Sequence, residues 1–182
     1  MSSTPQHEST LTNALLPSAQ LASLLQIVID LKRRRMVNGS RYAGFEDLVL
    51  TDGNAMPIKH SAFTIDRGLP RQCYANCLKI AKKNKMLHYC EGFALANTIP
   101  IPVPHAWLWH STEGTILEPT WDKPGTAYWG IAFQTDWLVS FLKARRRHDI
   151  TSVFEGNYLE KYSLLREGLP PGAYHSQAIK AE

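Results

Sequence analysis

The feature that most constrains the fold is a change of hydrophobic period in the middle of the chain. Residues 73–86 carry apolar residues at helical spacing, with lysines on the opposite face. Strand-like apolar runs follow at short intervals, at residues 89–95, 106–110, 115–117 and 127–133. One helix that leads into closely spaced strands favours an antiparallel meander. The pattern therefore predicts an α+β fold in which this helix packs on the sheet.

The flanking segments predict two further helices, a flexible N-terminal segment and a C-terminal tail. Residues 18–36 and 134–147 each show an apolar helical face. The polar start, residues 1–17, is expected to be flexible, and residues 168–182 are expected to form a C-terminal tail. Since neither an internal repeat nor a domain linker is present, residues 18–167 are predicted to form a single domain.

Composition indicates a soluble globular protein. The chain has 182 residues, of which 44% are hydrophobic and 20% charged. No apolar run reaches the length of a membrane span, and the polar start carries no signal-peptide pattern. The three cysteines are an odd number, which disfavours a disulfide framework and suits a reducing compartment. We therefore expect a cytoplasmic protein without a membrane partner.

The net charge of +4 is concentrated in two basic runs. Residues 32–35 and 145–147 each follow an apolar periodic segment. Such runs are typical of helix C-termini, where cations complement the helix dipole. The alternative is a patch that binds nucleic acid or another polyanion. We favour the helix ends, so a nucleic-acid partner is not expected.

Cys73 stands at the predicted start of a helix, shortly after Pro70. Free backbone N–H groups and the positive dipole end would stabilise a thiolate there, and Arg71 adds a nearby positive charge. This position predicts a cysteine of lowered pKa that acts as a nucleophile. The alternative is that Cys73 is a small buried hydrophobic residue.

A histidine and a glutamate follow on successive strands. His105 shares a strand face with Trp107 and Trp109, and Glu118 stands just before Pro119 at the end of the next strand. A hairpin of these two strands would return Glu118 to His105, where a carboxylate can orient an imidazole. The alternatives are a strand-edge histidine with a polar role and a surface glutamate in a turn.

Together these residues resemble a known family. Cys73 at a helix start, His105-Ala106-Trp107 on a strand and Glu118-Pro119-Thr120-Trp121 at the next strand end resemble the transglutaminase-like core of the papain-like cysteine superfamily. The resemblance covers roughly residues 70–133. In addition, residues 44–50 are similar to a stretch of small uncharacterised bacterial and phage proteins that carry this core. The implied fold is α+β and papain/transglutaminase-like, with Cys73, His105 and Glu118 as the triad.

The sequence departs from the family pattern in two places. The third triad residue is usually Asp, whereas this chain has Glu118, with Asp122 as a second candidate. The glycine-rich lead common before the family cysteine is replaced by Arg71 and Gln72. The backbone N–H of Cys73 is expected to serve an oxyanion hole, with Gln72 as a possible second donor.

The resemblance implies a cysteine-dependent acyl-transfer enzyme that uses a Cys-His-Glu triad and requires no cofactor. Its substrate would be an amide or ester of a protein or peptide, and its acceptor either water, as in a protease or deamidase, or an amine, as in a transglutaminase. The expected cleft residues are Gln72, Tyr74 and Trp107.

Two other readings remain open. One is a catalytically inactive member of the fold that binds a peptide or nucleotide in an aromatic cleft; the residues of that cleft are Tyr74, Trp107, Trp109 and Trp121. The other is a zinc site built from three cysteines and a histidine, namely Cys73, Cys77, Cys90 and His105. The usual spacing of zinc ligands is absent, so we expect no metal.

Overall fold

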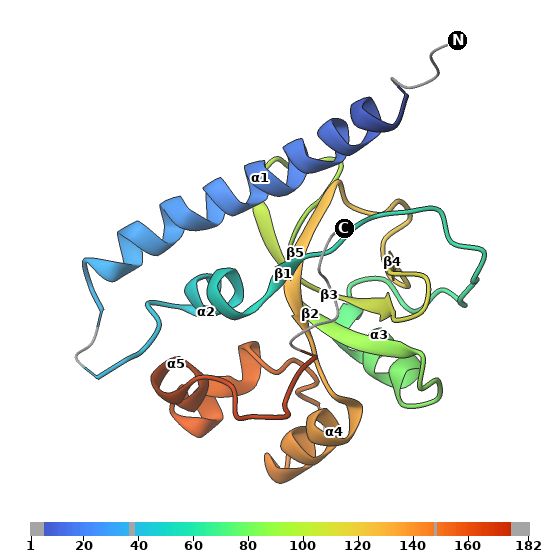
Figure 1. The fold of residues 1–182 in the computed structure, drawn as a ribbon. Coiled ribbons are helices and arrows are strands. Elements are labelled where there is room, and N and C mark those ends of the chain that lie inside the picture. Colours follow the sequence, from blue (N-terminus) through green and yellow to red (C-terminus); the bar gives the residue numbers. More distant parts are fainter. Residues whose placement is uncertain (1–5, 37–38, 148, 176–182) are drawn as a thin grey trace.

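A computed structural model describes residues 6–36, 39–147 and 149–175 of the chain, with side chains described from residue 17 onward. It shows the expected combination of helices with an antiparallel sheet (Figure 1). The helices are α1 (Gln6–Arg33), α2 (Phe45–Asp52), α3 (Cys73–Ala81), α4 (Thr135–Ala144) and α5 (Ser163–Glu167), with a 3-10 turn at Glu155–Glu160. The strands are β1 (Asn54–Ala55), β2 (Leu87–Leu95), β3 (Pro102–His110), β4 (Thr115–Leu117) and β5 (Ala127–Ala132).

The strand order differs from the expected meander. It is β1-β5-β2-β3-β4, so the chain crosses from one edge of the sheet to pair β5 with β2. Six residues of β5 pair with β2, whereas the short strand β4 forms three residue pairs with β3. Gly92 on β2 permits the approach, because a Cβ atom there would lie 2.2 Å from the carbonyl oxygen of Trp129. The prediction of a meander was therefore wrong in its last step, although every predicted strand exists.

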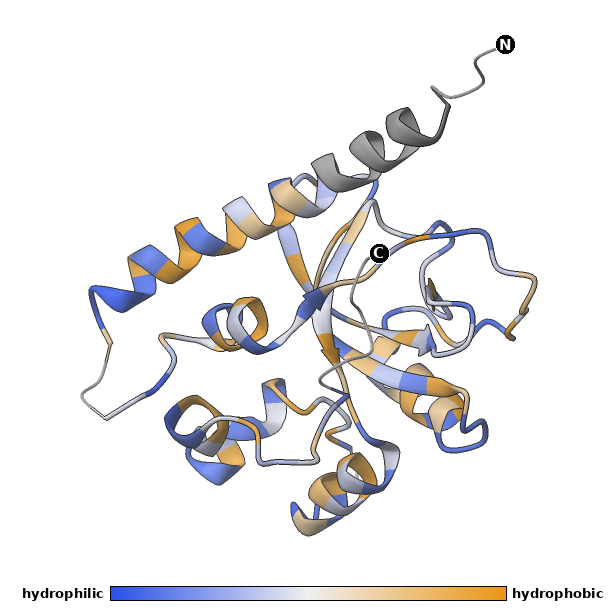
Figure 2. Ribbon diagram, viewed as in Figure 1, coloured by the Kyte–Doolittle hydropathy of each residue, from blue (hydrophilic) through white to orange (hydrophobic). Residues whose placement is uncertain are grey.

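Helices and sheet enclose two hydrophobic clusters on opposite faces of the sheet. Alternation along β3 sends Ala106 and Leu108 to one face and Trp107 and Trp109 to the other. The first cluster, which we call the helix-side core, includes residues of α1, α2, α3 and α4. The second, which we call the Trp-side core, includes Trp107 and Trp109 together with residues of β2, β4 and β5. Figure 2 shows hydrophobic residues along the strands and alternating bands on α1.

Regular structure extends beyond the predicted domain, residues 18–167, at both ends of the chain. Helix α1 begins at Gln6 and continues through Pro17, so residues 6–17 are helical. At the other end, Ala173 is fully buried and Tyr174 forms a bridge with Phe133. The chain therefore stays on the sheet as far as His175, whose N–H donates to the carbonyl of Ala132. The rest of the expected tail, residues 176–182, lies outside the described residues.

The proline-rich segment before His105 enters the sheet earlier than expected. Strand β3 starts at Pro102, and Pro104 pairs with Phe93 of β2. Proline is tolerated because β4 covers only Leu108 to His110, which leaves the outer edge of β3 open along residues 102–106. The open edge matters for the site, because His105 lies within it.

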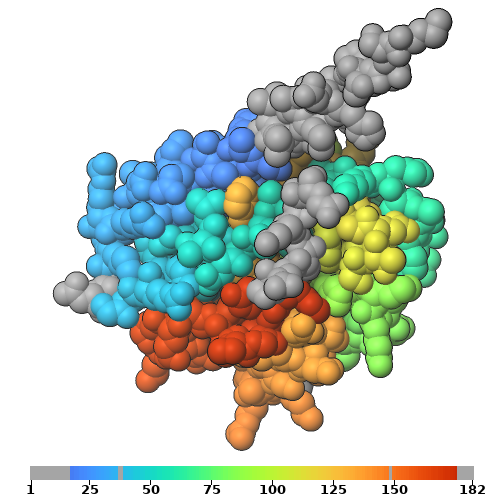
Figure 3. All heavy atoms as spheres, in the orientation of Figure 1, coloured from blue at the N-terminus to red at the C-terminus, as the bar shows by residue number. Residues whose placement is uncertain are grey.

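The basic runs end helices, as predicted. Lys32 and Arg33 form the last turn of α1 and pair with Glu46 and Asp47 of α2. The second run follows α4, and its first member, Arg145, is buried. Figure 3 shows α1 and α2 side by side on one face of the molecule, consistent with this pairing. Among the described helices, none is long and apolar enough to cross a membrane.

Candidate active site

His105 and Glu118 form a direct hydrogen bond. The Nε2 atom of His105 lies 2.8 Å from Oε2 of Glu118. The β3–β4 hairpin brings them together, because the pairing of Leu108 with Leu117 leads the chain back along the open edge of β3. Their side chains are 3% and 2% exposed, respectively. The predicted contact between the two residues is thus confirmed, and it is shielded from water.

Glu118 is fixed by further hydrogen bonds. Its Oε1 accepts from the backbone N–H groups of Thr120 and Trp121, at 2.9 and 3.1 Å. The hydroxyl of Tyr128 donates to Oε2 at 3.0 Å, while the N–H of Gly125 donates to the same hydroxyl. Burial and the neighbouring Glu118 raise the pKa of Tyr128, so its hydroxyl stays a donor. These donors orient the carboxylate toward His105.

Trp121 covers the pair. Its ring stacks on the imidazole of His105 at a centroid distance of 3.8 Å and an interplanar angle of 13°. Asp122, the second candidate for the carboxylate, lies elsewhere: its side chain is 98% exposed and forms an ion pair with Arg67. Glu118 is therefore the carboxylate partner of His105, as first expected, and the second candidate, Asp122, does not contact it.

Cys73 is the first residue of α3, as predicted. Backbone N–H groups of Ala106 and Tyr74 hydrogen-bond to its sulfur and lower the pKa, but burial outweighs them and raises the pKa of the thiol to about 11. The buried charges of Glu91 and Glu118 act in the same direction as burial. The expectation of a lowered pKa was therefore wrong. The helix start does not compensate for the loss of solvent around the sulfur.

The sulfur and the imidazole approach β3 from different sides. Cys73 packs against the helix-side core, which includes Ala106, whereas His105 contacts Trp107, Trp121 and Tyr128 on the opposite face. Although the structure describes both side chains, no hydrogen bond joins Cys73 to His105. The triad implied by the resemblance requires His105 to face Cys73, whereas in this structure the two side chains lie on opposite faces of β3. The two residues are neighbours through the backbone of Ala106 at the open strand edge.

Glu91 is a buried carboxylate that the sequence reasoning missed. It lies on β2 and is 1% exposed. Its oxygens accept from the hydroxyls of Ser152 and Tyr89 and from the N–H groups of Val153 and Phe154, at 2.5 to 3.0 Å. Burial raises its pKa despite these donors. The available signal was a single charged residue in the otherwise apolar run of β2.

Comparison of the chain with protein-family models, curated proteins and solved structures gives no match. The resemblance to the transglutaminase-like core therefore rests on the chain's own motifs.

The expected cleft residues have different roles. Trp107 is fully buried in the Trp-side core, where its Nε1 lies 2.9 Å from the sulfur of Met56. Trp109 is buried beside it, so an aromatic cleft that includes these two residues was a wrong prediction. Tyr74 is half-buried, and its hydroxyl donates to Glu155 at 2.7 Å. Gln72 is exposed and borders a cavity on another face of α3.

The residues of the considered zinc site are divided between the two cores. Cys73 and Cys77 belong to the helix side, whereas Cys90 lies in the Trp-side core. In the described part of the chain, no group of three or more His, Cys, Asp or Glu side chains could hold a metal ion. The three cysteines are free thiols.

Proposed function

We propose that this chain is a cysteine-dependent acyl-transfer enzyme, with Cys73 as nucleophile, His105 as base and Glu118 as the residue that orients the histidine. The observation that best supports the proposal is the buried 2.8 Å hydrogen bond between His105 and Glu118. It occupies Nε2 and leaves Nδ1 as the nitrogen that can exchange a proton with the thiol. The second support is the position of Cys73 at the start of α3, with its sulfur at the N–H of Ala106.

The mechanism begins with proton transfer. A thiol with a pKa of about 11 is protonated at neutral pH, so it needs a base. In the proposed first step, Nδ1 of His105 takes the proton of Cys73 while the sulfur attacks the substrate carbonyl. When the tetrahedral intermediate collapses, the imidazolium gives that proton to the leaving amine or alcohol, and a thioester remains on Cys73. Water, deprotonated by His105, then releases the acid and restores the thiol.

This mechanism requires the imidazole to reach the sulfur. The edge of β3 is open along residues 102–106, so we propose that His105 turns around this edge when a substrate is bound. In many enzymes, catalytic hydrogen bonds are long or poorly aligned in the free protein and tighten only when the substrate binds. In the proposal Glu118 shifts together with the ring, so that its bond to Nε2 is kept. The open edge of β3 therefore lies at the centre of the proposed site.

The start of α3 supplies donors for the developing oxyanion. The backbone N–H of Cys73 lies in the first turn, where intrahelical acceptors are lacking. We propose it as the first donor of the oxyanion hole, since the N–H of Tyr74 is directed at the Cys73 sulfur. Gln72 is exposed, and its amide has no hydrogen-bond partner within the described ranges, so it can turn toward a bound substrate.

We propose hydrolysis of a protein or peptide substrate, because water is always present as acceptor. We also propose a cytoplasmic location, in keeping with three free thiols.

The test uses an activated ester, p-nitrophenyl acetate, as a general acyl donor. The wild type should show a burst of p-nitrophenol, and mass spectrometry should find an acetyl group on Cys73. Cys73→Ala should abolish both signals, whereas Cys77→Ala, which removes a second thiol from the same helix, should retain them. Equal release by the wild type and Cys73→Ala, with no acetyl on Cys73, would contradict the proposal.

One observation favours a second candidate function. Cys73 has a raised pKa and no hydrogen bond to His105 in this conformation. Both features are expected of a catalytically inactive protein with this fold. Such a chain would bind a peptide without acylation. The ester test separates the two candidates, because a binding module gives neither a burst nor a labelled Cys73.

A further inference from the structure

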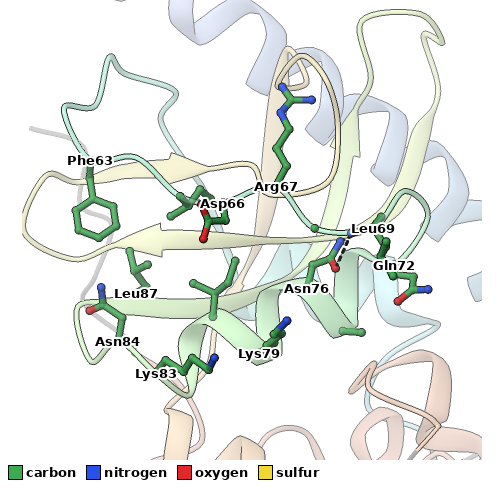
Figure 4. Close-up of a pocket in the computed structure, with 14 residues that line it drawn as sticks. Phe63, Asp66, Arg67, Leu69, Gln72, Asn76, Lys79, Lys83, Asn84 and Leu87 are labelled. Carbon is green, nitrogen blue, oxygen red and sulfur yellow. Dashed lines mark hydrogen bonds between the residues drawn. The ribbon is translucent and has the colours of Figure 1, made fainter.

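A cavity of about 680 Å³ lies between α3 and the segment that precedes it. Residues 63–69 form one side, and the other side is formed by α3 with Asn76 and Lys79 and by its flanking residues Gln72 and Lys83 (Figure 4). Its volume falls in the range of small-molecule sites, about 300–1,000 Å³. Neither Cys73, His105 nor Glu118 lines it, and it borders the proposed active site at Gln72.

The cavity combines an apolar interior with unpaired cations. Its apolar lining comes from both walls and from the start of β2, and comprises Phe63, Ile65, Leu69, Ala75, Ile80 and Leu87. Lys79 lies in the last turn of α3 and Lys83 in the turn that follows the helix. Both are exposed, and neither has an ion-pair partner among the residues that the structure describes. Two like charges four residues apart repel each other, and an anion bound between them would relieve that repulsion.

The other charges at the cavity leave this balance positive. Arg67 is engaged by Asp122, and Figure 4 shows its side chain directed away from the two lysines. Asp66 is the acidic residue of the lining, and it lies on the wall formed by residues 63–69. Lys79 and Lys83 thus outnumber the one carboxylate, and an anionic ligand is favoured over a cation.

The wall opposite α3 is held in place without a ligand. The amide of Asn76 accepts from the N–H of Leu69 at 3.2 Å and donates to the carbonyl of Leu69 at 2.8 Å. Gly68 lies directly against Asn76, since a Cβ atom there would stand 2.1 Å from that side chain, and its N–H donates to the carbonyl of Pro119. A preformed cavity lowers the ordering cost of binding.

We propose that this cavity binds a small amphipathic organic anion, with its apolar body between Phe63, Ile80 and Leu87 and its carboxylate between Lys79 and Lys83. A medium-chain carboxylate has this chemistry. The proposal stands independently of the acyl-transfer mechanism, because it uses no residue of that mechanism.

The experiment is a calorimetric titration of the full chain with decanoate. The wild type should bind one equivalent. Lys79→Gln/Lys83→Gln should weaken binding at least tenfold, whereas the matched variant Lys82→Gln/Lys85→Gln, which removes two exposed lysines that do not line the cavity, should change it less than twofold. Equal weakening by both double variants would indicate general electrostatic attraction and overturn the proposal.

A second variant tests the cavity without changing charge. Ala75 lines the cavity on α3, so Ala75→Phe fills part of the space that the decanoate chain would occupy. Binding should then be lost while circular dichroism and the urea unfolding midpoint stay close to those of the wild type. Unchanged decanoate binding by Ala75→Phe, or no binding by the wild type, would overturn the proposal.

Discussion

His105 and Glu118 are bonded at 2.8 Å inside a shell of protein that leaves both side chains almost without contact to water. Trp121 covers the imidazole, and three further donors hold the carboxylate. Such a pair costs free energy to bury and is strongly unfavourable when one partner is removed. The pair lies at the edge of β3 that no strand covers. We therefore assign the pair a functional role rather than a purely structural one.

Glu118→Gln should reduce esterase activity by about 10²–10⁴-fold and leave the chain folded. The amide keeps an acceptor for the N–H groups of Thr120 and Trp121, but it cannot hold the same imidazole tautomer. The measurement is kcat for p-nitrophenyl acetate, with circular dichroism to check folding. Asp122→Asn is the matched control, since that carboxylate is exposed. Full activity of Glu118→Gln would remove Glu118 from the mechanism.

Arg145→Gln should lower the free energy of unfolding by about 3 kcal/mol. The Arg145 side chain is 1% exposed, bonds Glu160 at 2.8 Å and donates to the carbonyls of Ser152 and Val153. Arg147→Gln, two residues away on the surface, should cost less than about 0.5 kcal/mol. Urea unfolding measures the free energy of unfolding of both variants. Similar losses would contradict the claim that Arg145 stabilises the fold and that Arg147 does not.

Stability should decrease as the pH falls from about 6.5 to 4. Burial, with a smaller contribution from the charge of His175, lowers the pKa of His88 to about 4. Below the ordinary value near 6.5 the unfolded chain takes up a proton that the folded His88 does not, so unfolding is favoured. Since His88 is partly exposed, we expect a loss of about 1 kcal/mol.

The measurement is urea unfolding at pH 7.5 and pH 5, for the wild type and His88→Gln. The variant should show a smaller decrease over this range, because it lacks the titrating ring. A decrease of the same size in both proteins would assign the pH dependence to other groups.

The local elements were largely predictable from the sequence. The apolar period of residues 73–86 and the strand runs that follow it depend on nearest neighbours along the chain, and α3 and β2 to β5 formed where these patterns indicated. The contact of His105 with Glu118 was predictable for a similar reason, since a hairpin fixes which residues return to one another.

What could not be predicted depends on contacts between distant segments. The pairing of β5 with β2 and the face of β3 on which α3 packs are settled by the whole sheet, and the second of these separates Cys73 from His105. The pKa of Cys73 is raised by burial. Burial depends on tertiary packing and cannot be predicted from the spacing of residues around Cys73. Trp107 and Trp109 alternate as a cleft lining would, yet they fill the Trp-side core.

The central claim is that His105 activates Cys73 toward a bound acyl donor, and the most direct measurement is the rate of Cys73 acylation by p-nitrophenyl acetate across pH, read by mass spectrometry. In the wild type, we predict a substantial rate already near neutral pH, because a base that takes the proton removes the need for a preformed thiolate. In His105→Gln, the rate should instead rise only toward the thiol pKa of about 11. A wild-type rate that itself rises only near pH 11, and that coincides with the His105→Gln profile, would contradict the account.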